Sequence, residues 1–304
     1  MTTDSRSTGG ELDASRAREG LLAGLVAYVL WGFLPIYFKA VESVPSLEIL
    51  AHRILWAVPF GLPIILMLRQ WGDVRAALAD RRTVSLLALS ATLIAVNWLV
   101  YIWAVQREQI FQASLGYYIN PLMYVVVGVV FFSERLRRPQ VAAVALAAVG
   151  VGVLTLSGGT FPAIALTLAT SFTIYGVIRS RVAVGGMPGL FIETLILFPA
   201  AAAYLARLVA ADAAVFGTSE PALAGLLVVA GPLTVLPLLA FALAARRLPL
   251  STIGIMQFIA PTMQFVVGVA YGEPLTRAHI VCFTLIWIAV AVFSIDAWYA
   301  SRRA

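Results

Sequence analysis

Ten apolar runs, each about as long as a lipid bilayer is thick, constrain the fold of this chain more than any other feature. A helix needs roughly 20 apolar residues to cross the hydrocarbon core. Hydrophobic residues make up 61% of the 304 residues and charged residues only 12%, whereas a typical soluble domain has about 25% charged residues. The sequence therefore predicts an all-α integral membrane protein with ten transmembrane helices. The runs cover approximately residues 20–38, 47–68, 83–105, 111–132, 140–157, 161–178, 188–208, 222–243, 251–271 and 278–299.

The basic residues indicate how these helices are oriented. If the N-terminus is cytoplasmic, 16 of the 21 Lys and Arg residues lie in cytoplasmic segments, four lie on the other side and Arg53 lies within a span. Because segments rich in Lys and Arg stay in the cytoplasm, both termini are predicted to be cytoplasmic, with a polar, disordered tail over 1–19 and a short tail over 300–304. The net charge of +6 comes from these short segments and does not indicate nucleic-acid binding.

Rare residue types exclude several kinds of chemistry. Lys39 is the only lysine and follows Phe38, so the chain has no phosphate-binding loop of the G-x-x-x-x-G-K-[ST] type. Cys282 is the only cysteine, so neither an intrachain disulfide nor a Cys-based metal motif can form. His52 and His279 are the only histidines, which leaves little scope for a histidine-based metal site. We therefore expect no metal, no cofactor and no catalytic residues.

The two halves of the chain resemble each other. The segment "SLGYYINPLMYVVVGVVFFSERL" (114–136) matches "TIGIMQFIAPTMQFVVGVAYGEPL" (252–275). Each repeat, 20–157 and 161–299, contains five spans. Because five is odd, the second repeat enters the membrane from the opposite side, and such inverted repeats are common in secondary transporters.

Ionisable side chains inside the apolar runs are the first candidates for a functional site, because each costs about 2.5–3.5 kcal/mol at the membrane centre. Glu48, His52 and Arg53 lie near the start of the second run, and Glu193 lies early in the seventh. Helical geometry places Glu48, His52 and Trp56 on one stripe, whereas Arg53 points about 100° away from His52. Arg53 is therefore expected to find its partner on another helix. The candidates at similar depth are Tyr37, Tyr101 and Tyr117.

Two interpretations of these charges stay open. In one, Arg53 attracts an anionic group, the Glu48–His52 pair takes part in proton coupling, for which an ordinary histidine pKa of about 6.5 is suited, and Glu193 contributes to a gate. In the other, Arg53 reaches toward the interface, Glu48 and His52 serve helix packing, and Glu193 faces solvent in an inner vestibule. A Glu193–Arg53 salt bridge is not expected, because their depths differ by roughly 10 Å.

Polar residues in the middle of the spans form a second group of candidates. Pro121 and Pro261 occupy matching positions in the repeats, and each frees a backbone carbonyl one turn earlier. Such carbonyls are tolerated in a membrane only where they are buried or line a cavity. The alternative for the neighbouring amide side chains is that they hold helices together. The predicted substrate-binding residues are Arg53, His52, Asn97, Tyr101, Tyr117, Asn120, Gln257, Gln264 and Trp31, and the predicted coupling or gate residues are Glu48, His52 and Glu193.

Five motifs together carry a resemblance to a known family. "AYVLWGFLPIYFK", "EILAHRILW", "NWLVYIWAV", "SLGYYINPL" and "TIGIMQFIAPT", within two five-helix repeats, resemble the EamA branch of the drug/metabolite transporter superfamily, and within it the RarD permeases. The resemblance implies a permease of the bacterial inner membrane that exports a small amphipathic metabolite or drug by alternating access. Its expected partners are this small molecule and the lipid bilayer, and a homodimer stays open. The alternatives are a membrane-embedded enzyme acting on lipids or isoprenoids and a non-transporting receptor or scaffold.

Overall fold

The apolar runs form helices throughout the part of the chain that the structure describes. The computed structural model describes residues 5–132, 136–158, 161–217 and 221–301. Over these residues the chain forms twelve helices, and ten segments are long and apolar enough to cross a membrane. The prediction of an all-α membrane protein with ten spans is therefore confirmed. The helices of the first half are α1 (Ser5–Ala40), α2 (Ser46–Met67), α3 (Trp71–Ala79), α4 (Arg81–Gln106), α5 (Ile110–Phe132) and α6 (Arg138–Gly158). Those of the second half are α7 (Ala163–Ser180), α8 (Gly186–Ala210), α9 (Pro221–Ala245), α10 (Leu250–Met256), α11 (Ile259–Ala270) and α12 (Arg277–Ser301).

The helix boundaries differ from the sequence prediction at the N-terminus. The structure begins α1 at Ser5, although residues 1–19 were expected to be disordered. Glu, Leu, Ala and Arg in "ELDASRARE" favour a helix, and extending an existing helix avoids the cost of nucleation. Residues 1–4, and residues 302–304 of the predicted C-terminal tail, lie outside the described part of the chain.

The ninth span is divided, whereas its counterpart in the first repeat is continuous. Helix α10 ends at Met256 and α11 starts at Ile259. Between them, the amide of Phe258 donates to the carbonyl of Ile255, three residues earlier. Pro261 lacks the amide that would bond to the carbonyl of Gln257, which removes one bond of the α-helical ladder at this turn. Helix α5 continues through Pro121.

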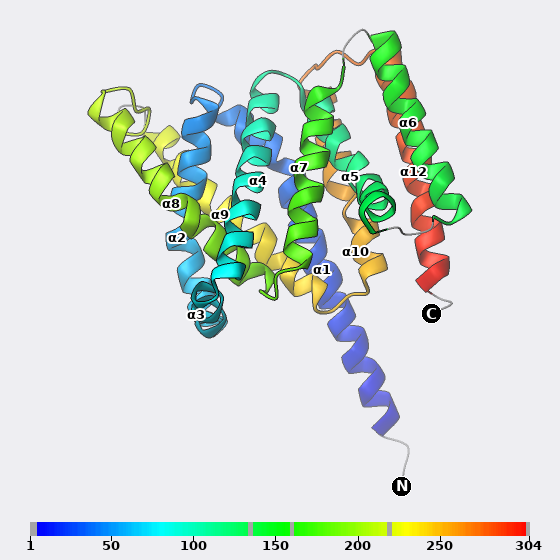
Figure 1. Cartoon of the computed structure of the whole chain (residues 1–304), viewed down its shortest axis with the longest axis horizontal. Coiled ribbons are helices and arrows are strands. Elements are labelled where there is room, and N and C mark those ends of the chain that lie inside the picture. The colour runs from blue at the N-terminus through cyan, green and yellow to red at the C-terminus, as the bar shows by residue number, and fades with distance from the viewer. Residues whose placement is uncertain (1–4, 133–135, 159–160, 218–220, 302–304) are drawn as a thin grey trace.

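The spans cross the bundle alternately. Helix α1 begins and α12 ends on the same face of the bundle, which we call the termini face, and α3 also lies there (Figure 1). The connections α1–α2, α4–α5, α8–α9 and α11–α12 therefore lie at the other end, which we call the opposite face. Glu48 in the first turn of α2 is near the opposite face, and Glu193 in the second turn of α8 is near the termini face.

The helix pairings follow a pattern that relates the two repeats. Helix α1 packs against α9 and α11, and its counterpart α7 packs against α4 and α5. Exchanging the two repeats converts the pairings of α1 into those of α7, because α9 is the counterpart of α4 and α11 is the counterpart of α5. Three further pairs, α2 with α8, α5 with α11 and α6 with α12, join a helix to its own counterpart, and Figure 1 shows α6 and α12 side by side at one edge. This pattern is consistent with an inverted repeat.

A glycine allows the close approach of α2 and α9. A Cβ atom at Gly231 would lie 2.6 Å from the backbone carbonyl of Trp56, which is closer than real Cβ atoms come. Only glycine fits at this crossing, since the obstacle is backbone that cannot rotate away. The contact fixes α9 against the part of α2 that carries Arg53, and so places Thr234, one turn further along α9, beside it.

Candidate functional site

Arg53 points from α2 into the helix bundle and is only 5% exposed. Its Nε donates a hydrogen bond to the hydroxyl of Thr234 on α9 at 2.7 Å. The guanidinium lies over the ring of Trp98 on α4, 4.1 Å from the ring centroid, a geometry that favours a cation–π interaction. The expectation that Arg53 meets another helix is confirmed, and its extension toward the interface is not observed.

The three predicted tyrosines surround Arg53 without bonding to it. The phenols of Tyr117, Tyr37 and Tyr101 lie within electrostatic reach of the guanidinium. Tyr37 donates its hydrogen bond to the carbonyl of Leu226 at 3.0 Å, and Tyr117 donates to Asn97. The Tyr101 hydroxyl is buried and has no hydrogen-bond partner among the described residues. Arg53, Thr234, Trp98, Tyr37, Tyr101 and Tyr117 form what we call the Arg53 cluster.

The predicted stripe on α2 is confirmed and is covered by a connection. Trp56 Nε1 donates to His52 Nδ1 at 3.2 Å, so a neutral His52 carries its proton on Nε2. That nitrogen lies 4.0 Å from Glu48 Oε1. The same oxygen accepts from the backbone amides of Val215 at 2.8 Å and Phe216 at 3.4 Å. Glu48 therefore holds the α8–α9 connection against the stripe.

Phe216 completes this arrangement at the opposite face. Its ring packs against His52 at a centroid distance of 4.9 Å and against Trp56 at 6.3 Å. Two polar atoms beneath it, Glu48 Oε2 and His52 Nε2, are buried without a hydrogen-bond partner in the described chain. The stripe thus contains an incompletely satisfied carboxylate and imidazole under an aromatic cover.

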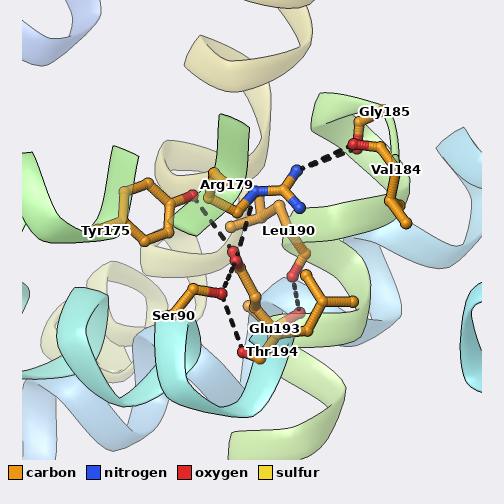
Figure 2. A network of polar contacts seen from close by, with 9 residues as sticks. Ser90, Tyr175, Arg179, Val184, Gly185, Leu190, Glu193 and Thr194 are labelled. Carbon is orange, nitrogen blue, oxygen red and sulfur yellow. Dashed lines mark hydrogen bonds and ion pairs between the residues drawn. The ribbon is translucent and has the colours of Figure 1, made fainter. Parts of the chain in front are cut away.

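Glu193 is the centre of a second polar network, near the termini face (Figure 2). Its Oε1 accepts from the Ser90 hydroxyl at 2.6 Å and lies 3.5 Å from Arg179 Nε, and its Oε2 accepts from Tyr175 at 3.3 Å. Glu193 is 1% exposed, so the alternative that it faces solvent in a vestibule is wrong. The expectation that it does not pair with Arg53 is confirmed, because Arg179 is its ion-pair partner.

Arg179 also holds a connection. Its Nη2 donates to the carbonyls of Val184 at 3.4 Å and Gly185 at 3.2 Å, in the segment between α7 and α8. The guanidinium lies directly against the backbone of α8, since a Cβ atom at Gly189 would meet Nη2 at 2.1 Å. Figure 2 shows Arg179 between Glu193 and these two carbonyls. Glu193 and Arg179 together hold the α7–α8 connection, as Glu48 holds the α8–α9 connection at the other end.

The predicted amides lie between helices and most of their polar atoms have partners. Asn97 donates to the carbonyl of Leu168 at 3.0 Å and to Ser171 at 2.9 Å, and it accepts from Tyr117 at 3.1 Å. Asn120 accepts from Thr173 at 2.8 Å. These bonds join α4, α5 and α7, as the helix-packing alternative predicts. Direct contact of these amides with substrate stays a prediction.

The remaining predicted residues lie near the divided span. Gln264 on α11 donates to the carbonyl of Trp31 at 3.1 Å, while its Oε1 is buried without a partner among the described residues. The Trp31 ring packs against Tyr28 and Phe241. Gln257 directly follows Met256, the last residue of α10. The structure therefore places Gln264 and Trp31 together at the α1–α11 contact.

Sequence reasoning missed Thr234, Ser90 and the role of Arg179. Thr234 lies 181 positions from Arg53, and no local pattern marks it. As a basic residue at the end of a span, Arg179 also fits the charge pattern that orients the protein. Its position at the end of a span, a short connection before Glu193, was a signal that the two could pair.

The opposite face carries one more partly buried carboxylate that the sequence did not single out. Both oxygens of Glu273, between α11 and α12, accept from the backbone amide of Phe111 at 3.1 Å. Burial raises the pKa of Glu273 to about 7, although hydrogen bonds from the backbone of Phe111 and Ile110 act to lower it. Nearby charges act in both directions, since Glu108 raises the pKa and Lys39 lowers it. Glu273 thereby joins the second repeat to the start of α5.

The fold and these buried charges define a class of protein. Ten membrane-length segments enclose a buried arginine cluster, and at each end of the bundle a buried carboxylate holds a connection, Glu48 directly and Glu193 through Arg179. This is a multi-pass α-helical membrane protein with the architecture of a transporter.

Comparison with known proteins identifies the family. Residues 18–156 match the EamA-like transporter family. The chain is 44% identical to "Protein RarD" of Salmonella typhi, over 96% of this chain and 100% of the relative. It is 44% identical to an "Uncharacterized transporter" of Vibrio cholerae, over 96% of this chain and 98% of the relative. The chain belongs to the EamA-like transporter family, among its RarD-like permeases, and is a membrane transporter of the drug/metabolite type in the bacterial inner membrane.

A solved structure supports the fold alone. The chain superposes on a protein known from a crystal structure with a TM-score of 0.59, at 20% sequence identity, over 92% of this chain and 98% of the other.

Proposed function

We propose that this protein is a secondary transporter that exports a small amphipathic molecule by alternating access, with both termini in the cytoplasm. One observation carries the proposal: the Arg53 cluster lies between two connections, one held by Glu48 and the other by Arg179, which is paired with the buried Glu193. Alternating access requires a central site that two closures expose in turn. The concentration of Lys and Arg in segments on the termini face supports the orientation.

The residues of the Arg53 cluster support an amphipathic cargo. Arg53 and the Tyr101 hydroxyl offer polar contacts, while the rings of Trp98 and Phe38 lie beside the guanidinium, at 4.1 and 6.0 Å from their centroids. Small-molecule sites commonly combine a few placed polar groups with an aromatic lining. In this proposal Arg53, Tyr101 and Tyr117 contact the cargo, and Asn97 positions Tyr117.

The Glu48–His52 pair is the proposed site of proton coupling. Both groups have an unsatisfied buried atom, and they lie 4.0 Å apart beneath Phe216. Protonation of Glu48 would weaken its hydrogen bonds to the α8–α9 connection, because amides bond more strongly to a charged carboxylate than to a neutral acid. Proton uptake at this pair would therefore favour release of that connection.

The transport activity can be tested in living cells. Cells that overproduce the wild type are compared with cells that overproduce E48Q, E193Q or the control R207Q, whose arginine is exposed at the end of α8. The medium is analysed by untargeted mass spectrometry, and protein in the membrane is quantified. We expect at least one small amphipathic compound to accumulate with the wild type and R207Q only. Equal media from all four strains, at equal protein levels, would refute export.

The two proposed closures can be tested by cysteine accessibility in a C282A background. V184C and V215C place one thiol in each held connection, at residues that are held through their backbone, since Arg179 donates to the carbonyl of Val184 and Glu48 accepts from the amide of Val215. We expect E193Q to raise maleimide labelling at V184C and to lower it at V215C, and E48Q to do the reverse. Parallel changes at both positions would indicate general loosening and contradict alternating access.

A further inference from the structure

Arg53 carries a charge that no described residue neutralises. Its Nε is bonded to Thr234, and its two terminal nitrogens make no hydrogen bond to any part of the chain that the structure describes. A buried guanidinium is normally paired, because isolated charges are costly away from water. The side chain is nonetheless held in place, on one edge by Thr234 and on one face by Trp98.

The two deep carboxylates of the bundle are already committed to other groups. Glu48 binds the amides of the α8–α9 connection and lies beside His52, and Glu193 binds Arg179, Ser90 and Tyr175. Neither forms an ion pair with Arg53. The charge is therefore not a member of a structural salt-bridge network within the described residues.

A second unsatisfied group lies beside this arginine. Tyr101 is 2% exposed, and its hydroxyl has no partner among the described residues, whereas the phenols of Tyr37 and Tyr117 donate to Leu226 and Asn97. Two terminal guanidinium nitrogens and one hydroxyl thus remain as donors in the same cluster. A forked pair of guanidinium donors matches the two oxygens of a carboxylate or phosphate.

We propose that Arg53 and Tyr101 bind the anionic oxygens of the cargo, so that the transported molecule is an amphipathic organic anion bearing a carboxylate or phosphate group. This inference rests on the proposed transport function and names the substrate class of its central site. The apolar part of the anion contacts Trp98 and Phe38, whose rings flank the guanidinium.

A purely structural role for Arg53 makes a different prediction about the empty protein. An arginine that only joins α2 to α9 and α4 should stabilise the ligand-free fold, so R53Q should lower its thermal midpoint clearly. An arginine held without a counter-charge for a ligand should not, because its desolvation opposes its contacts. We therefore expect R53Q to keep a thermal midpoint at or above that of the wild type, measured in detergent without ligand.

Binding is tested with matched probes on the purified full-length protein. The probes are 4-phenylbutyrate, its neutral amide 4-phenylbutyramide, and phenyl phosphate, and binding is measured by titration calorimetry. The variants are R53Q, R53K, Y101F and the exposed control R207Q. We expect an anionic probe to bind the wild type and R207Q, and the amide to bind at least about tenfold more weakly. R53Q should lose about tenfold or more in affinity for that anion, and R53K and Y101F should lose less.

The probes also separate the two anion chemistries and the possible failures. Tighter binding of 4-phenylbutyrate assigns the site to carboxylates, and tighter binding of phenyl phosphate assigns it to phosphate esters. Equal affinity of the acid and its amide, unchanged affinity of R53Q, or no binding of either anion to the wild type would overturn the inference.

Transport is measured separately, with the probe that binds, in proteoliposomes that contain the wild type. Binding that depends on Arg53 without any flux would refute the transport proposal and leave the anion site standing. Flux of the neutral amide that R53Q does not affect would do the opposite, because it would support transport and refute an anion requirement.

Discussion

The ion pair near the termini face offers the sharpest test of how the bundle is closed. Glu193 and Arg179 have side-chain exposures of 1% and 13%, and their charged atoms lie 3.5 Å apart. Removing one member of a buried pair costs about 3–5 kcal/mol, because the other charge remains buried. The isosteric E193Q keeps an oxygen for Ser90, and Arg179 keeps its bonds to Val184 and Gly185. We therefore expect E193Q to destabilise the protein by about 3 kcal/mol, at the lower end of that range.

A double-mutant cycle isolates the pair from its surroundings. R179Q and the double variant R179Q/E193Q complete the cycle, and unfolding is followed in mixed micelles of increasing SDS content. We expect a coupling free energy of about 1.5–3 kcal/mol, since residues in one network couple by up to about 3 kcal/mol.

A second ion pair of the same protein serves as the matched control. Arg247 and Glu19 are 3.3 Å apart, and their side chains are 33% and 60% exposed. Solvent screens such a pair, and its coupling should be only about 0.2–1 kcal/mol. If the coupling between residues 179 and 193 is no larger than this, the buried network does not hold the α7–α8 connection, and the proposed closure at the termini face is refuted.

Three further predictions concern single positions. G231A should lose about 1–3 kcal/mol of stability because its methyl group would meet the backbone of Trp56, whereas the control G225A on the same helix, with nothing within 4 Å, should be neutral or stabilising; a similar loss in both would contradict the packing argument. Because the folded-state pKa of Glu273 is raised to about 7, its contribution to stability is fully present below the unfolded pKa of about 4.3 and is lost as the pH rises through 7. E273Q should flatten this part of the stability–pH curve, and an unchanged slope would contradict the prediction. N97A should cost about 1–2 kcal/mol in unfolding experiments, as a loss of interhelical hydrogen bonds, and unchanged stability with reduced transport would instead place Asn97 at the cargo.

The ten spans could be predicted from the sequence because their signal is local. Bilayer thickness sets the length of an apolar helix, and no knowledge of neighbours is needed. The break at Gln257 was partly foreseeable from Pro261, which frees that carbonyl. Why α5 continues through Pro121 could not be read in the same way, since the two prolines have equivalent positions in the repeats and differ only in what surrounds them.

The contents of the site could be predicted only in part. The stripe of Glu48, His52 and Trp56 follows from helical periodicity alone, and the structure shows it. The partner of Arg53 depends on which helices touch, and that contact is set by the fit of Gly231 against Trp56. A single sequence does not encode such a fit in any local pattern. For this reason the sequence predicts that the partner of Arg53 lies on another helix but does not identify Thr234.

The distribution of charge in the bundle explains why Arg53 differs from the other buried ionisable groups. Glu193 has an ion-pair partner, and Glu48 accepts hydrogen bonds from two backbone amides and lies beside His52. Both carboxylates therefore have charged or polar partners within the chain, at its two ends, although Glu48 Oε2 has no hydrogen-bond partner among the described residues. Arg53, between them, is positioned by a neutral hydroxyl and an indole ring, neither of which cancels its charge. A chain that needed this arginine only for packing could use an apolar side chain there at lower cost, so the uncancelled charge is best explained by a partner that arrives and leaves.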